Sequence, residues 1–311
     1  VQAIQQLLPQ ERKKIGFFVE YSSTSAVAQI DLVHSLQRKY DLFPVDLAAS
    51  PTLDGLDAIC VLNPTREFSE SDAYKIDQFI VKGGKALFLV DGVKIDTLEN
   101  QGLAISPRKT GLENILFHYG LRINANIVKD AQLSGMIPLK VGNMGNKPNI
   151  QLMPWPSFPL LNGNPQHLIT KNLDAIYGRF VSTIDTISGV HLRKMPLLRT
   201  SPYTQVAKAP SLLSFSSAGK DFDPAAYQAG VQTAAYLVEG KFHSAFLHLT
   251  QDTSFVATGK TESAIIVVSD GDIALNGVDY ASRQALPLGF DPFMKNTFAN
   301  KDFLLNAFSY L

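Results

Sequence analysis

The sequence predicts an α/β protein whose core is a doubly wound, mostly parallel sheet with an inserted β-rich region. Two observations support this fold class. Short apolar runs alternate with amphipathic helical stretches over residues 1–130, and the same alternation returns over residues 255–311. Between them, residues 131–254 are rich in Pro, Gly, Asn and Ser, and helical periodicity fades.

The first expected strand is a short apolar run at residues 15–20 (IGFFVE), which follows a charged stretch. Residues 22–25 (SSTS) then offer several N-caps for a helix. The apolar stripe of that helix is expected on Ala26, Ile30, Val33 and Leu36. A strand followed by a helix is the first half of the repeating unit of an α/β fold.

The clearest unit is a strand–helix–strand arrangement. A buried strand at 57–62 is followed by a helix that Ser69 can cap, with Asp72 three positions on. The glycines at 83–84 end this helix, and residues 85–90 form the next strand. Because such crossover connections are right-handed, the two strands are expected to be parallel.

The middle of the chain predicts β structure. Alternating apolar residues indicate a strand with one buried face over 121–127. Residues 131–225 predict short strands and long loops, and Trp155, flanked by prolines, is expected to be buried as an anchor of this region. Two more strands are expected at 234–238 and 245–249.

The α/β pattern returns with a buried strand at 264–268 and a final helix that Asn300 is expected to cap. These elements would rejoin the first sheet, which gives one interrupted domain. The expected organisation is an α/β core from residues 1–130 plus 255–311, with 131–254 as an inserted or adjoining β-rich, loop-rich region. This layout is flavodoxin-like.

The overall composition gives no signal for several classes of function. Lys plus Arg and Asp plus Glu each number 28, so the formal net charge is zero and gives no electrostatic signature of nucleic-acid binding or of an anionic membrane surface. The longest apolar runs, such as that at 264–268, are far shorter than the roughly 18–20 residues that a spanning helix needs. The single cysteine, Cys60, excludes an intrachain disulfide but does not identify the compartment.

Polar residues gather where the predicted parallel strands end, which is where doubly wound folds bind ligands. This edge would carry Glu20, Asn63, Thr65, Asp91, Asp270 and Asp272. One interpretation is a site for a small ligand, a cation or a partner protein. The other is ordinary turn structure, because Asp and Asn after a strand hydrogen-bond their own backbone. The sequence leaves both interpretations open.

No pattern predicts catalysis, a metal site or a cofactor. Cys60 lies inside an apolar strand rather than in a glycine-flanked elbow, so we expect a core residue. Gly-x-Ser-x-Gly, Walker A and Gly-x-Gly-x-x-Gly patterns are absent. The histidines lack zinc-ligand spacing, and a calcium loop starting at Asp270 fails because Ala274 and Ala281 occupy ligand positions.

Several short segments carry a family resemblance through their order and their joint coverage of the chain. They are 63–70 (NPTREFSE), 74–80, 83–85, 89–92, 116–121, 127–130, 196–201, 238–246 and 301–307. Together they resemble the GldG family, the auxiliary component of gliding-associated ABC transporters, and the wider ABC-type uncharacterised transport-system domain. The α/β layout also resembles class I glutamine amidotransferase-like domains, without their Cys-His pair in recognisable form.

The resemblance implies a non-catalytic domain on the periplasmic side of the bacterial inner membrane. It implies work with separate permease and ATPase subunits in gliding or linked secretion, and membrane helices that flank the domain and are absent from this chain. No matching segment carries a catalytic motif, so the family supplies no site residues.

Two alternatives from other classes stay open. A binding protein for a sugar or peptide predicts an apolar pocket with aromatic walls. A hydrolase or transferase using the strand-end carboxylates requires Asp91 and either Asp270 or Asp272 to share one cleft.

Overall fold

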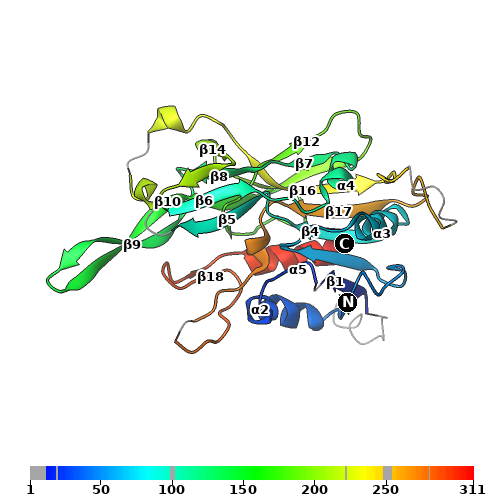
Figure 1. Ribbon diagram of the computed structural model, residues 1–311, viewed down its shortest axis with the longest axis horizontal. Helices are drawn as coiled ribbons and strands as arrows, with labels where there is room; N and C mark the ends of the chain where they lie inside the picture. Colours follow the sequence, from blue (N-terminus) through cyan, green and yellow to red (C-terminus); the bar gives the residue numbers. More distant parts are fainter. Residues whose placement is uncertain (1–11, 19, 99–101, 221–222, 248–253, 280) are drawn as a thin grey trace.

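The computed structural model describes residues 12–18, 20–98, 102–220, 223–247, 254–279 and 281–311. A ten-stranded mixed sheet runs through the molecule (Figure 1). Its strands in spatial order are β11 (Ile176–Tyr177), β10 (Lys147–Gly163), β13 (Arg193–Arg199), β16 (Thr233–Gly240), β17 (Ser263–Val268), β4 (Lys85–Leu89), β3 (Ala58–Leu62), β1 (Lys14–Phe18) and β2 (Asp41–Val45), and β9 (Ser134–Met144) pairs with β10.

The half of the sheet from β2 to β17 is parallel. Its central strands β3, β4 and β17 are almost entirely buried, as continuous apolar runs predict for strands covered on both faces. Helices α2 (Ala26–Gln37) and α5 (Asn300–Tyr310) share one core cluster with this sheet. Helices α3 (Glu70–Val81) and α4 (Glu113–His118) share the other. The prediction of an α/β protein with a βαβ unit over 57–90 is therefore confirmed.

The other half of the sheet is antiparallel, so the expectation of a mostly parallel sheet was wrong. β17 pairs in parallel with β4 and antiparallel with β16, after which β13, β10 and β11 continue antiparallel. Strands from residues 131–254 thus hydrogen-bond into the same sheet as the strands on either side of them in sequence. Whether that region forms a separate unit stays a prediction.

A layer of smaller sheets lies over the antiparallel half (Figure 1). It contains β5 (Val93–Leu98), β6 (Gly102–Pro107) and β15 (Ser211–Leu213) in one sheet, β7 (Leu121–Ile123) with β12 (Ile184–Thr186), and β8 (Asn126–Asp130) with β14 (Thr204–Lys208). Trp155 belongs to the core cluster of this layer and is 1% exposed, which confirms its predicted burial. Its Nε1 donates to Ser217 Oγ at 3.2 Å.

Four local predictions were wrong. The expected strand over 121–127 is two strands, β7 and β8, which pair with different partners. Residues 134–163 form strands of 11 and 17 residues, not short strands and long loops. No strand covers 245–247, and 248–249 lie outside the described residues.

The fourth concerns Asn300, which follows the N-cap of α5 instead of being the cap. Its side chain accepts a hydrogen bond from Tyr177 N and donates one to Tyr177 O, both at 2.9 Å. Asn300, a residue type that often caps helices, instead bridges the final helix and β11.

Two short strands, β18 (Phe290–Asp291) and β19 (Asn296–Thr297), and 3₁₀ turns at Phe215–Ser217, Pro224–Ala226 and Gly271–Ala274 complete the described elements. Among the described helices, none combines the length and apolar content needed to cross a bilayer.

Candidate functional site

Three carboxylates meet at the carboxyl ends of β4 and β17, because these neighbouring strands run parallel. Asp91 Oδ1 accepts a hydrogen bond from Gly271 N at 2.7 Å. Asp270 Oδ1 accepts from Asp272 N at 2.8 Å, and Asp270 Oδ2 accepts from Arg179 N at 2.7 Å. The structure thus brings together Asp91, Asp270 and Asp272, and it connects two of them to backbone N–H groups.

Two arginines flank these carboxylates. Arg108 donates to Pro64 O at 3.0 Å and to Val93 O at 3.2 Å, and its Nη2 lies 3.9 Å from Asp91 Oδ2. The guanidinium of Arg179 lies over the rings of Phe158 and Tyr177. Both arginine charges act on Asp272. We call Asp91, Asp270, Asp272, Arg108 and Arg179 the strand-end cluster.

Burial makes the carboxylates of the strand-end cluster weak acids. Burial and then the charge of Asp272 raise the pKa of Asp91, the Gly271 N–H and Arg108 oppose the shift, and the resulting pKa is about 6. Burial, and then repulsion from Asp272 and Asp91, raises the pKa of Asp270 well above its ordinary value. Burial also raises the pKa of Asp272, against the charges of Arg179 and Arg108. The cluster therefore retains protons at pH values where exposed carboxylates have lost them.

Asn63 packs against this cluster from the end of β3. Its backbone has a positive φ of 42°, and its buried side-chain Oδ1 has no hydrogen-bond partner among the described residues. A Cβ at Gly271 would lie 2.6 Å from Asn63 Cβ, so only glycine fits at that position. The ends of β3 and β17 are in direct contact here.

Glu20 and Thr65 are not brought into the strand-end cluster. Glu20 Oε1 accepts a hydrogen bond from Leu47 N at 2.9 Å. Thr65 N donates to Tyr21 O at 2.8 Å, and Thr65 Oγ1 accepts from Ser23 N at 3.1 Å. Both residues organise the loops that follow β1 and β3.

The crevice beyond β1 and β3 is filled by the protein's own side chains. Tyr21 stacks on Phe68 with ring centroids 3.7 Å apart, and its hydroxyl donates to Asp72 Oδ2 at 2.6 Å. Burial and the Asp72 carboxylate raise the pKa of Tyr21 to about 12. Asp72 also accepts from Ser69 Oγ at 2.8 Å, and Ser69 caps α3 as predicted. The usual ligand position of a doubly wound sheet is therefore occupied.

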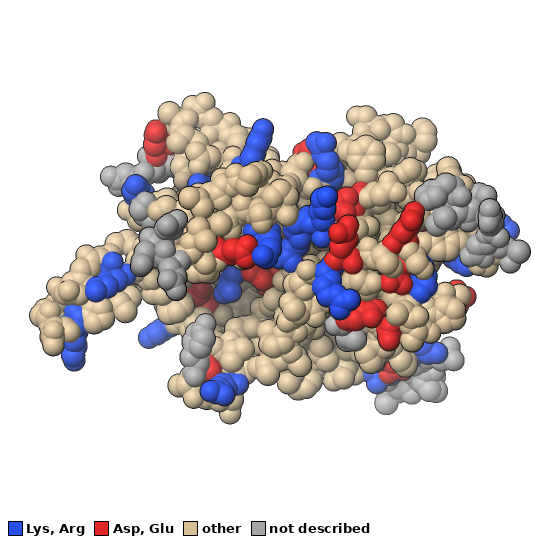
Figure 2. Space-filling model, viewed as in Figure 1, with Lys and Arg blue, Asp and Glu red and all other residues tan. Residues whose placement is uncertain are grey.

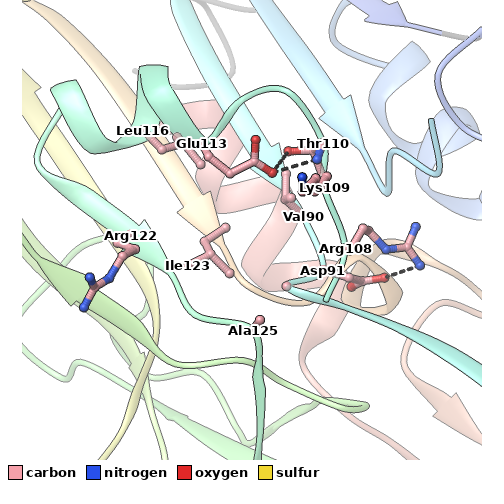
Figure 3. A pocket seen from close by; sticks show the side chains of 11 residues that line it. Val90, Asp91, Arg108, Lys109, Thr110, Glu113, Leu116, Arg122, Ile123 and Ala125 are labelled. Atoms are coloured by element: carbon pink, nitrogen blue, oxygen red, sulfur yellow. Dashed lines mark hydrogen bonds and ion pairs between the residues drawn. The ribbon is translucent and has the colours of Figure 1, made fainter. Parts of the chain in front are cut away.

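A cavity of about 460 Å³ adjoins Asp91 and was not expected from the sequence (Figure 3). It is lined by Val90, Asp91, Gly92, Arg108, Lys109, Thr110, Glu113, Leu116, Arg122, Ile123 and Ala125. Glu113 Oε1 accepts from Thr110 N at 2.7 Å, and Oε2 accepts from Gly111 N at 2.9 Å. The sequence pattern Thr110-x-x-Glu113 is a capping-box signature that would have located this wall.

A second hollow, of about 520 Å³, has aromatic walls. Trp155, Phe158, Phe180 and Phe215 line it together with aliphatic residues of β5, β6 and β9. Phe180 follows Arg179 of the strand-end cluster in sequence, so the two features adjoin.

Neither a metal centre nor a cysteine nucleophile is formed by the described residues. No group of three or more His, Cys, Asp or Glu side chains in this part of the chain is arranged to hold a metal ion. Cys60 is fully buried, and burial raises the pKa of its thiol well above the usual range. The prediction that Cys60 is a core residue is confirmed.

Comparison with known proteins gives the chain a family. The family described as "ABC-type uncharacterized transport system" matches residues 12–307. The chain belongs to this family. The family, unlike the strand-end cluster, connects this domain with an ABC-type transport system and suggests an accessory protein of it.

The individual relatives are distant. An uncharacterized protein of Borreliella burgdorferi is 23% identical over 205 residues, which is 63% of this chain and 38% of that protein. The chain thus spans well under half of that relative's length. The solved structure of the mmIFT52 N-terminal domain has a TM-score of 0.51 at 10% identity, with 96% of each chain covered, and so shares the fold. A putative ThuA-like protein from Parabacteroides merdae has a TM-score of 0.42 at 11% identity, covering 96% of this chain and 89% of that chain.

The raised pKa of Asp91 predicts a pH-dependent stability. At pH values between the ordinary pKa of a carboxyl group and about 6, Asp91 keeps its proton in the folded protein but has released it in the unfolded chain. This stabilisation is full below about pH 4 and is lost as the pH rises through about 6, which costs on the order of 3 kcal/mol. Between pH 4 and pH 7, the free energy of unfolding should therefore fall less for Asp91→Asn than for the wild type, as measured by urea unfolding.

Asp96→Asn is the matched control, because Asp96 is an exposed carboxylate paired with Lys94. Its stability profile should run parallel to that of the wild type. If the stability profile of Asp91→Asn also ran parallel to that of the wild type, the raised pKa of Asp91 would be contradicted.

Proposed function

We propose that this chain is the extracytoplasmic domain of an accessory subunit of an ABC transporter, related to GldG, and that it acts without catalysis. The observation that carries the proposal is the family match, which runs from residue 12 to residue 307 and so includes both halves of the sheet. The domain would lie on the periplasmic side of the inner membrane and contact a separate permease and ATPase. Its process would be gliding motility or the secretion linked to it.

The geometry of the strand-end cluster supports a non-catalytic role. A general base needs a lone pair that faces a substrate. Both oxygens of Asp270 accept backbone N–H groups, Asp91 accepts another, and Glu113 accepts two. Both oxygens of Asp270 and of Glu113, and one oxygen of Asp91, are therefore engaged in holding loops.

The strand order supports a finer assignment of the fold. In chain order, the parallel strands β1, β2, β3, β4 and β17 lie as 2-1-3-4-5, with helices on both faces. This is the flavodoxin-like order. We assign the parallel half to that class, with the antiparallel strands added at the β17 edge.

The test of this function is purification of the full-length protein from its native membrane in mild detergent. An ATPase and a permease should be recovered in stoichiometric amounts. Recovery of the protein alone, under conditions in which other ABC transporters stay intact, would contradict the proposal.

A second candidate function, binding of a sugar or peptide, is favoured by the aromatic hollow. Phe215 lines this hollow and is 38% exposed, so Phe215→Ala should leave the fold intact. If the hollow binds such ligands, titration calorimetry against oligosaccharide and peptide panels should give saturable heat that Phe215→Ala abolishes. Phe293→Ala, which removes another exposed ring, should retain it. No heat with any ligand, or heat unchanged in Phe215→Ala, would exclude the hollow as the site.

A further inference from the structure

The β9–β10 hairpin presents an apolar face that no described residue covers. Its register places Met136, Pro138 and Lys140 opposite Pro154, Leu152 and Ile150. Directly opposed residues of an antiparallel pair lie on the same face of the ribbon. All six of these residues are exposed, and Ile150 is 60% exposed. We call these six the outer face of the hairpin.

The opposite face anchors the hairpin to the body of the protein. Ile137 and Trp155 belong to the core cluster of the layer of smaller sheets and are 8% and 1% exposed. Beyond this anchored base, the hairpin extends away from the molecule (Figure 1). Met144, close to the turn, is 73% exposed, and Val141 is 44% exposed. A two-stranded ribbon with exposed apolar side chains is marginal in water, which indicates that something covers it.

The charge of this region has one sign. The sequence contains no Asp or Glu from residue 131 to residue 173, although the whole chain is neutral. The hairpin carries Lys140 on its outer face and Lys147 beside Met144 at the turn. Figure 2 shows blue and tan, without red, over the projecting hairpin. The surface is therefore complementary to an anionic partner.

The hairpin is poorly suited to strand addition or to a protein interface. Pro138 in β9 and Pro148 in β10 lack the backbone N–H that pairing with another strand needs, and Lys140 adds a charge. Protein interfaces favour aromatic residues, Arg and Met and disfavour Lys, and of the favoured types the outer face of the hairpin carries only Met. Residues 131–154 contain no aromatic residue and no Arg. Aliphatic side chains next to lysines are instead suited to the interface of an anionic bilayer.

We propose that the β9–β10 hairpin is a membrane-contacting arm that seats its outer face and tip among the headgroups of anionic phospholipids. Met144, Ile150 and Leu152 enter the boundary between headgroups and acyl chains, and Lys140 and Lys147 lie at the lipid phosphates. This surface is separate from the strand-end cluster and does not depend on the transporter assignment.

The test is co-sedimentation of the chain with vesicles of phosphatidylglycerol mixed with phosphatidylcholine, compared with phosphatidylcholine alone. Binding should require phosphatidylglycerol and weaken at high salt. Lys140→Gln combined with Lys147→Gln should lower the affinity by roughly tenfold or more, since each lysine contributes near the surface. Met144→Ser combined with Ile150→Ser should lower it about as much.

Leu168→Ser combined with Val231→Ser is the matched control. Leu168 and Val231 are 77% and 51% exposed and lie outside the hairpin, so this variant loses the same number of exposed apolar side chains. It should bind like the wild type.

Three outcomes would overturn the proposal. They are no binding to the anionic vesicles, binding that both hairpin variants retain, and concentration-dependent self-association that the hairpin variants abolish. The last outcome would assign the outer face to a second copy of the chain.

Discussion

β17 forms parallel hydrogen bonds with β4 on one side and antiparallel hydrogen bonds with β16 on the other, and this double pairing holds the two halves of the molecule in one sheet. All six residues of β17 are buried. Ile265 and Val267 face one core cluster, and Ile266 and Val268 face the other. A strand from late in the chain therefore joins the N-terminal α/β elements to the β-rich middle in one sheet.

The same pairing creates the strand-end cluster. Because β4 and β17 are parallel, Asp91 and Asp270 leave the sheet side by side, and Gly271 packs on Asn63 from β3. Crowding these carboxyl groups in a buried place costs free energy, which their raised pKa values record. Backbone N–H groups and the Arg108 and Arg179 charges offset the cost. The cluster thus fixes the loops around it, including the wall of the cavity beside Asp91.

Much of the parallel half could be predicted because its signals are local. Apolar runs, the Ser69 cap and the paired glycines at 83–84 each act within a few residues. Together they imply that Asp91 and Asp270 leave the sheet at the same edge, and the structure adds that their strands are neighbours. The ligand-binding role of these residues stays a prediction. Glu20 and Thr65 follow β1 and β3 at the same edge but hydrogen-bond to Leu47 and Tyr21 instead of reaching the cluster, and no pattern near them indicates these contacts.

The remainder depends on contacts between residues far apart in sequence. Arg179 reaches the cluster because Asp270 accepts its backbone N–H across 91 positions, and Asn300 bridges to Tyr177 across 123. In β9 and β10, prolines weaken the strand signal even though β9 pairs with residues 147–154 of β10. The sequence does not predict that the sheet continues antiparallel past β17, because the composition of β16 and of β17 does not specify which strand each one pairs with.

We infer that β17 makes one cooperative unit of the two halves, and native-state hydrogen exchange can distinguish this from two halves that unfold independently. The backbone amides of β4 and of β16 should open with the same free energy, equal to that of global unfolding. If the free energy of opening of the amides in β16 and β13 is several kcal/mol lower than that in β4, the two halves are separate folding units and β17 does not join them into one.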